Sequence, residues 1–90
     1  MSPGADEPLA EDEVVVDATG LLCPLPILRA DRAMRRVAPG ATLVLLADDE
    51  GITVDLPAWC DGNGHELVSL ERDSVQGPRA RFRCVVRRKR

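Results

Sequence analysis

Aromatic residues are almost absent from this chain of 90 residues, which has one Trp, one Phe and no Tyr. Aliphatic side chains must therefore build the hydrophobic core, and the length allows one small domain with two packed layers. A surface that stacks the bases of single-stranded nucleic acid needs aromatic side chains. The sequence therefore does not predict direct binding of nucleic acid.

Paired cysteines and long apolar runs are also missing. The three cysteines are odd in number, form no CxxC pair and are not spaced as a disulfide framework. The N-terminus lacks the basic and apolar regions of a secretory signal, and the longest apolar stretch, 41–47, is too short to cross a bilayer. We therefore expect a soluble cytoplasmic protein with no membrane contact.

Charge is unevenly distributed along the chain, although the net charge is only −3. The acids and the absence of periodicity in residues 1–12 predict a disordered acidic leader, and 89–90 form a basic tail, with fraying expected from Arg88. Residues 13–88 then make the folded domain. Basic residues dominate its last strand, which could meet nucleic acid or an acidic protein. Charge on a solvated edge strand is the simpler explanation.

The hydrophobic pattern predicts the order strand, helix, strand, helix, strand, strand. The expected strands cover residues 14–16, 41–47, 65–72 and about 80–87, and the expected helices cover residues 24–37 and 52–62. The first strand is expected to be buried on both faces, the second to be central, and the last to have one arginine-rich solvated face. The predicted fold is α+β, a two-layer sandwich with two helices on one face of a four-stranded mixed sheet.

One cysteine stands at the predicted start of the first helix. Pro24 disfavours helical angles at Cys23, which predicts Cys23 as the N-cap and Pro24 as the first helical residue. Pro26 falls in the first turn, where its missing N–H has no intrahelical partner, and Leu25 N–H is the natural donor to the cap. The helix dipole would then lower the pKa of an exposed, rigidly held thiol.

The residues before this cysteine shape its loop. We expect Asp17 to accept hydrogen bonds from loop N–H groups and Gly20 to permit a positive φ.

Other polar residues carry weaker indications. The three adjacent acids 48–50 have no further ligand set, so no metal site is predicted. Cys60 and His65 are two potential zinc ligands, which do not make a site. Helical spacing places Cys60 against the sheet, and alternation places Cys84 in the core. His65 is expected to stabilise the turn into the third strand rather than to act on Cys23.

The thiol loop follows the pattern Asp-x-x-Gly-x-x-Cys-Pro-x-Pro at Asp17, Gly20, Cys23, Pro24 and Pro26. In this pattern the chain resembles the TusA/SirA family of small bacterial sulfur-carrier proteins, and the similarity covers about residues 14–88. It continues through Pro39-Gly40, Ala47-Asp48-Asp49, Asp55-Leu56-Pro57, Trp59-Cys60 and His65-Glu66-Leu67.

The resemblance implies that Cys23 accepts sulfane sulfur as a persulfide and hands it to a partner protein, as a sulfurtransferase. The donor would be similar to a cysteine desulfurase or a rhodanese, and the sulfur would serve tRNA thiolation or another sulfur-trafficking pathway. Because the persulfide forms on the protein's own cysteine, no bound cofactor is required, and a monomer is expected.

The same resemblance implies where partners make contact, namely at Leu25, Asp48, Asp49 and Asp55. Two positions differ from the tRNA-thiolating branch of the family. Leu25 stands where that branch often has an acid, and Val54 stands before Asp55 where that branch has an arginine. The chemistry of the thiol is unaffected, but the usual acceptor is not implied.

Two other functions remain open from the sequence. The chain could be a non-catalytic interaction or regulatory module in which Cys23 is not essential, working through its acidic leader and basic last strand. A thiol redox protein is disfavoured because no CxxC resolving cysteine is present, and it would require a reversible Cys23–Cys60 disulfide.

Overall fold

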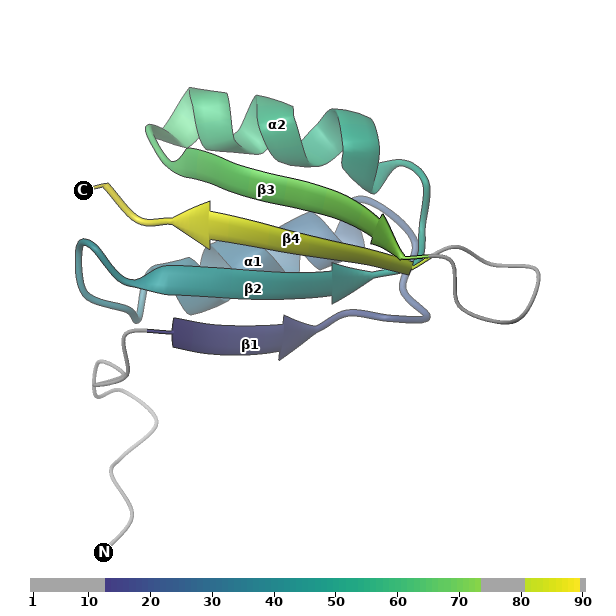
Figure 1. The fold of residues 1–90 in the computed structure, drawn as a ribbon, viewed down its shortest axis with the longest axis horizontal. Coiled ribbons are helices and arrows are strands. Elements are labelled where there is room, and N and C mark those ends of the chain that lie inside the picture. Colours follow the sequence, from purple (N-terminus) through teal and green to yellow (C-terminus); the bar gives the residue numbers. More distant parts are fainter. Residues whose placement is uncertain (1–12, 74–80, 90) are drawn as a thin grey trace, which may run out of the picture.

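A computed structural model describes residues 13–73 and 81–89, so the predicted leader, most of the last loop and residue 90 lie outside the described residues. The described elements occur in the predicted order, and both helices pack on the same face of a four-stranded mixed sheet (Figure 1). The α+β sandwich is therefore confirmed. The elements are β1 (Glu13–Asp17), α1 (Leu25–Met34), β2 (Thr42–Ala47), α2 (Ile52–Asn63), β3 (Glu66–Asp73) and β4 (Arg81–Arg87).

The strand order is β1-β2-β4-β3, with β1 parallel to β2 and the other neighbours antiparallel. This confirms that β2 is central. Two predictions are wrong: β4 is an inner strand rather than an edge strand, and β1 is an edge strand with Val15 59% exposed. The apolar run in β1 suggested burial on both faces, but only the face that carries Val14 and Val16 packs against the core.

The core lies between the helices and the inner face of the sheet. The predicted apolar stripe of α1 and the predicted inner face of β4 are buried in it, and so are Cys60 and Cys84. Each large aliphatic side chain buried in this way stabilises the fold by about 1.5–3 kcal/mol. The buried residues of this core include Ile27, Ala30, Met34, Leu43, Leu45, Ile52, Leu56, Phe82, Cys84 and Val86.

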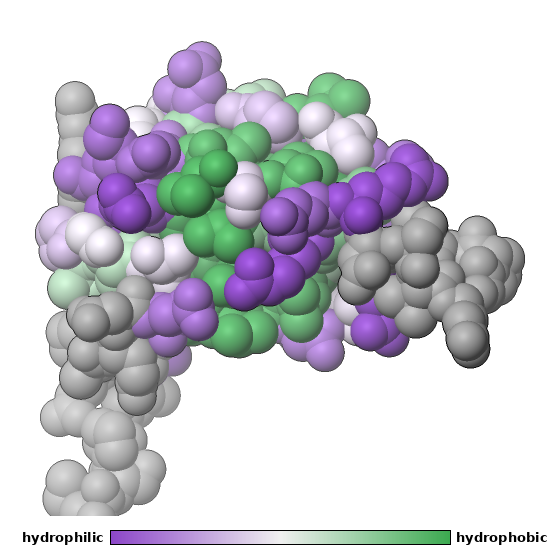
Figure 2. Space-filling view, viewed as in Figure 1, coloured by the Kyte–Doolittle hydropathy of each residue, from purple (hydrophilic) through white to green (hydrophobic). Residues whose placement is uncertain are grey.

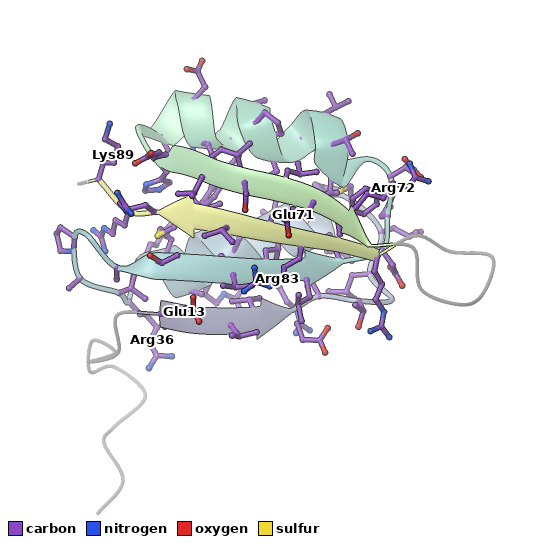
Figure 3. All side chains as sticks on the ribbon, viewed as in Figure 1. Glu13, Arg36, Glu71, Arg72, Arg83 and Lys89 are labelled. Atoms are coloured by element: carbon purple, nitrogen blue, oxygen red, sulfur yellow. The ribbon has the colours of Figure 1, made fainter. Side chains whose placement is uncertain are left out.

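The other face of the sheet carries no helix, and Figure 2 shows apolar side chains gathered at its centre. Strand register aligns Val15, Val44 and Val85 in one row across this face. Beside it, Glu71 pairs in register with Arg83, and both project from this face (Figure 3). Opposite charges facing each other across strands stabilise a sheet, which explains how the arginines of β4 are tolerated on an inner strand.

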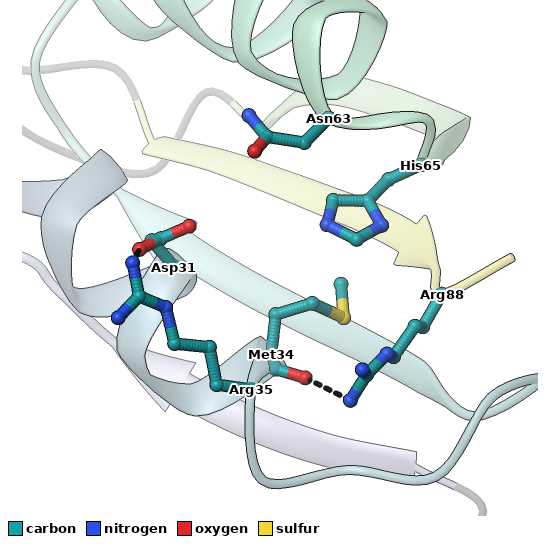
Figure 4. Close-up of a pocket in the computed structure, with 6 residues that line it drawn as sticks. All are labelled: Asp31, Met34, Arg35, Asn63, His65 and Arg88. Atoms are coloured by element: carbon teal, nitrogen blue, oxygen red, sulfur yellow. Dashed lines mark hydrogen bonds and ion pairs between the residues drawn. The ribbon is translucent and has the colours of Figure 1, made fainter. Parts of the chain in front are cut away.

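The end of α1 is closed by a residue near the C-terminus. The helix ends at Met34, earlier than predicted. Arg88 donates from its guanidinium to Met34 O (2.9 Å; Figure 4) and also to Val37 O. Arg88 N–H also donates to Ala41 O (2.9 Å). Fraying from Arg88 is therefore a wrong prediction, because a cation at a helix C-terminus satisfies carbonyls that have no intrahelical partner.

Candidate functional site

Two loops meet at the carboxyl ends of β1 and β2. Because these strands are parallel, the thiol loop (residues 18–24) after β1 and the acidic loop (residues 48–51) after β2 leave the sheet at the same end (Figure 1). Ala18 N–H donates to Leu46 O (2.8 Å), which extends this pairing one residue beyond β1. The topology therefore brings Cys23 beside acids that are about 25 residues away in sequence.

The first half of the thiol loop is held by two carboxylates. Asp17 Oδ1 accepts from Thr19 N–H (3.0 Å) and from the Thr19 hydroxyl (2.7 Å), and Asp48 Oδ1 accepts from Gly20 N–H (3.0 Å). Gly20 has φ +86°, a conformation that strains any residue with a Cβ. Asp17 thus accepts hydrogen bonds within the loop and Gly20 has a positive φ, as the sequence predicts.

Asp49 joins the cysteine to the start of α2. Its Oδ2 accepts from Cys23 N–H (2.8 Å), and its Oδ1 accepts from Gly51 N–H (2.9 Å). The resemblance implies partner contacts at Asp48 and Asp49, and the structure shows both carboxylates bound to backbone N–H groups of the two loops. These acids therefore set the position of the thiol from within the molecule.

Gly51 gives the thiol its place, and sequence reasoning missed it. A Cβ on Gly51 would lie 3.2 Å from Cys23 Cβ and 3.4 Å from Cys23 Sγ. The cysteine side chain therefore packs directly against the N-cap of α2, where any larger residue would crowd it. A glycine that follows an acid cluster and begins a predicted helix was the available signal.

The start of α1 is one residue later than predicted. Pro24 is the N-cap, and Pro26 is the second helical residue. The Cys23–Pro24 peptide is cis, and Leu25 N–H donates to Leu22 O (2.9 Å) instead of to a cap. Since Asp49 holds Cys23 N–H and a turn precedes the helix, Cys23 belongs to the loop and is not the N-cap.

The pKa of the Cys23 thiol moves in the direction opposite to the prediction. Partial burial, the charges of Asp49 and Asp55 and a side-chain hydrogen bond with Asp55 raise it to about 11. The thiol is half-buried rather than fully exposed. The prediction of a lowered pKa considered only the dipole of α1, which burial of the thiol and two carboxylates from distant parts of the chain outweigh.

Large apolar side chains around the cysteine remain exposed. Leu22 and Leu25, which flank it in sequence, are 66% and 47% exposed, and Val54 in the first turn of α2 is 71% exposed. Exposed apolar groups that cluster are typical of contact sites for other proteins. The half-buried thiol thus has exposed apolar side chains among its sequence neighbours that a visiting protein can cover, while Asp49 and Asp55 act on the sulfur itself.

His65 lies at the other end of α2, in the pocket shown in Figure 4. A helix of 12 residues spans about 18 Å and separates it from Gly51 and the thiol. The His65 ring packs on Trp59 with 5.0 Å between centroids, and the backbone N–H of His65 donates to Cys60 O (2.9 Å). The structure confirms that His65 supports the turn and does not reach Cys23.

In the described part of the chain, no group of three or more His, Cys, Asp or Glu side chains is arranged to hold a metal ion. Neither of the helices described is long and apolar enough to cross a membrane.

Comparison with known proteins identifies the family. A family model described as "Sulfurtransferase TusA" matches residues 14–88, which include both loops of the site. The chain belongs to the TusA family. Its predicted family is thus confirmed, and membership in this family of sulfurtransferases supports a general role in sulfur transfer.

A solved structure supports the fold assignment for this TusA family member. A SirA-like protein from Desulfitobacterium hafniense has a TM-score of 0.59 and 23% sequence identity. The match covers 80% of this chain and 95% of that chain. The likeness shows the shared fold.

Proposed function

We propose that this protein is a sulfur carrier that accepts sulfane sulfur as a persulfide on Cys23 and passes it to a partner protein. The observation that carries the proposal is the position of Cys23 in a chain of the TusA family. Its N–H is bound to Asp49, its side chain packs on Gly51, and its sequence neighbours Leu22 and Leu25 are exposed. Cys60 and Cys84 are buried in the core, so Cys23 is the accessible nucleophile.

The transfer needs no external oxidant or reductant, because sulfane sulfur moves from one persulfide to the next. The sulfur of Cys23 attacks the outer sulfur of a donor persulfide, a new S–S bond forms on Cys23, and the S–S bond of the donor breaks. The donor cysteine leaves as a thiolate and takes up the proton that the Cys23 thiol loses. In the second step an acceptor thiolate attacks the outer sulfur on Cys23, and the free thiol is regenerated.

The site suits a carrier that reacts only when a partner is docked. With a pKa of about 11, the free Cys23 thiol is mostly protonated near neutral pH and is a slow nucleophile. The apolar residues Leu22, Leu25 and Val54 offer the docking partner a surface beside the sulfur. The predicted partner contacts Leu25, Asp48, Asp49 and Asp55 all remain part of this proposal.

The partners follow from this chemistry. The donor is a protein persulfide of the cysteine desulfurase or rhodanese type, and the acceptor is a protein thiol that leads to tRNA thiolation or another sulfur-trafficking pathway. A reducing compartment such as the cytoplasm suits this carrier, because its thiol has to be free before each transfer.

The test is sulfur loading followed by mass spectrometry. The reduced protein is incubated with a cysteine desulfurase and cysteine, and intact mass is expected to rise by one sulfur atom. Cys23→Ala should lose this adduct, whereas the matched controls Cys60→Ala and Cys84→Ala should keep it. An unchanged adduct on Cys23→Ala would reject the assignment, and so would wild-type protein that takes up no sulfur.

A further inference from the structure

Arginines line one side of α1 and the turn that follows it. Arg29 and Arg32 are three residues apart and lie on the same side of the helix, and Arg36 follows in the turn after its end at Met34. They line a hollow of about 400 Å³ between α1 and β1, together with Val16 and Ala33. In Figure 3, Arg36 extends toward the β1 edge of the molecule.

A second hollow adjoins the first one. It measures about 200 Å³, shares Arg29 and Arg32, and is otherwise lined by the apolar residues Leu21, Leu25 and Leu28. Because the two hollows share these two lining residues, we treat them together and call them the α1 groove. It follows α1 from the thiol loop toward the end of the helix, about 15 Å for its 10 residues.

The α1 groove borders an edge of the sheet. Among the described strands β1 pairs only with β2, so its other edge presents main-chain N–H and C=O groups. An extended chain can add to such an edge by main-chain hydrogen bonds. A strand of five residues, the length of β1, spans about 17 Å, which matches the length of the groove.

We propose that the α1 groove binds an extended acidic segment of a partner protein, which pairs its main chain with β1 and its carboxylates with the groove arginines. Alternate side chains of an extended segment point to opposite faces of the sheet. The carboxylates can therefore enter the α1 groove, which the arginines line together with Val16 and Ala33, while the other set lies on the helix-free face beside Val15. Guanidinium groups bind carboxylates through two parallel hydrogen bonds.

Charge and composition favour this occupant over nucleic acid. Single-stranded RNA would find no aromatic side chain among the residues that line the groove. An acidic protein segment, in contrast, uses both the arginines and the aliphatic floor. A segment bound here reaches Leu25, which places the protein that carries it next to the thiol loop.

The test uses the full chain and a fluorescent peptide of roughly five Glu-Val repeats, long enough to span β1. Fluorescence anisotropy is expected to show saturable binding that weakens as salt is added. Arg29→Glu combined with Arg32→Glu should raise Kd by about tenfold or more, because like charges are then opposed. Circular dichroism establishes that this variant is folded.

Arg35→Glu is the matched control. It makes half the charge change of the double variant, at the C-cap of the same helix, but Arg35 pairs with Asp31 (2.8 Å) and lines the pocket of Figure 4 instead of the groove. Its Kd should change less than about twofold. A peptide that is N-methylated at alternate residues should bind about tenfold more weakly, because it loses donors to the β1 edge.

Several results would overturn the proposal. They are equal affinity of wild type and the double variant, equal affinity for a Lys-Val peptide, and equal affinity for the N-methylated peptide. Tighter binding of a single-stranded RNA of about ten nucleotides, lost in the same double variant, would assign the groove to nucleic acid instead. The assay transfers no sulfur, so its outcome is independent of the function proposed for Cys23.

Discussion

Replacing Asp55 with Asn is expected to make Cys23 more reactive near neutral pH. At a pKa of about 11, only about one Cys23 thiol in three thousand is ionised at pH 7.5. The substitution removes one nearby negative charge and a carboxylate that hydrogen-bonds the thiol, whereas burial and Asp49 continue to act. We therefore expect the pKa of Cys23 to fall by about one unit.

The rate follows from two opposing effects. A pKa lower by one unit gives about tenfold more thiolate at pH 7.5, but each thiolate is about threefold less nucleophilic. Exchange of Cys23 with a small aromatic disulfide should therefore be about threefold faster in Asp55→Asn than in wild type at pH 7.5. The advantage should shrink as pH rises toward the pKa of the variant.

The assay follows the release of the coloured thiol between pH 7 and pH 10, and peptide mass spectrometry assigns the modified cysteine. Asp61→Asn is the control, because it makes the same change at an exposed position in the last turn of α2. An unchanged or higher pKa in Asp55→Asn would refute the electrostatic account, and so would an equal effect of Asp61→Asn.

Three further predictions concern stability, measured as the free energy of unfolding in urea. Asp49→Ala leaves two loop N–H groups without their acceptor and should lower the free energy of unfolding by about 1–3 kcal/mol. Replacing its exposed neighbour, Glu50→Ala, should change this free energy by less than about 1 kcal/mol, and equal losses in the two variants would contradict the role of Asp49 in holding the loops. Gly20→Ala, at φ +86°, should lower it by about 1–2 kcal/mol, and Gly62→Ala, in open space on α2, should raise it by about 0.5–1 kcal/mol; a neutral Gly20→Ala would contradict the strain. All three thiols have a pKa raised to about 11 from 9.0, so between these pH values the folded state holds protons that the unfolded state loses. The free energy of unfolding should therefore be full below about pH 9 and fall as pH rises toward 11, and a flat pH profile would contradict these shifts.

The sequence alone was enough to predict the element order, the central strand and the buried stripe of α1. These features depend on periodicity within a few residues, which helices and strands express locally. The hydrogen bond that Asp17 accepts and the positive φ of Gly20 were predictable for the same reason. Both features belong to one turn, in which the donor follows the acid by two residues.

Errors arose where residues distant in sequence compete with local preference. Cys23 was predicted as an N-cap, but Asp49 holds its N–H from the next strand's loop. Arg88 was expected to fray, but it meets carbonyls at the end of α1. A local pattern contains no information about such partners.

The thiol shows most clearly what each level decides. The sequence by itself placed Cys23 between a strand and a helix, since prolines and glycine act on their immediate neighbours. Only the parallel pairing of β1 and β2 brought Asp49, Gly51 and Asp55 to the sulfur and raised its pKa. Electrostatic and burial effects act through space, so the protonation state of this cysteine is a property of the tertiary structure.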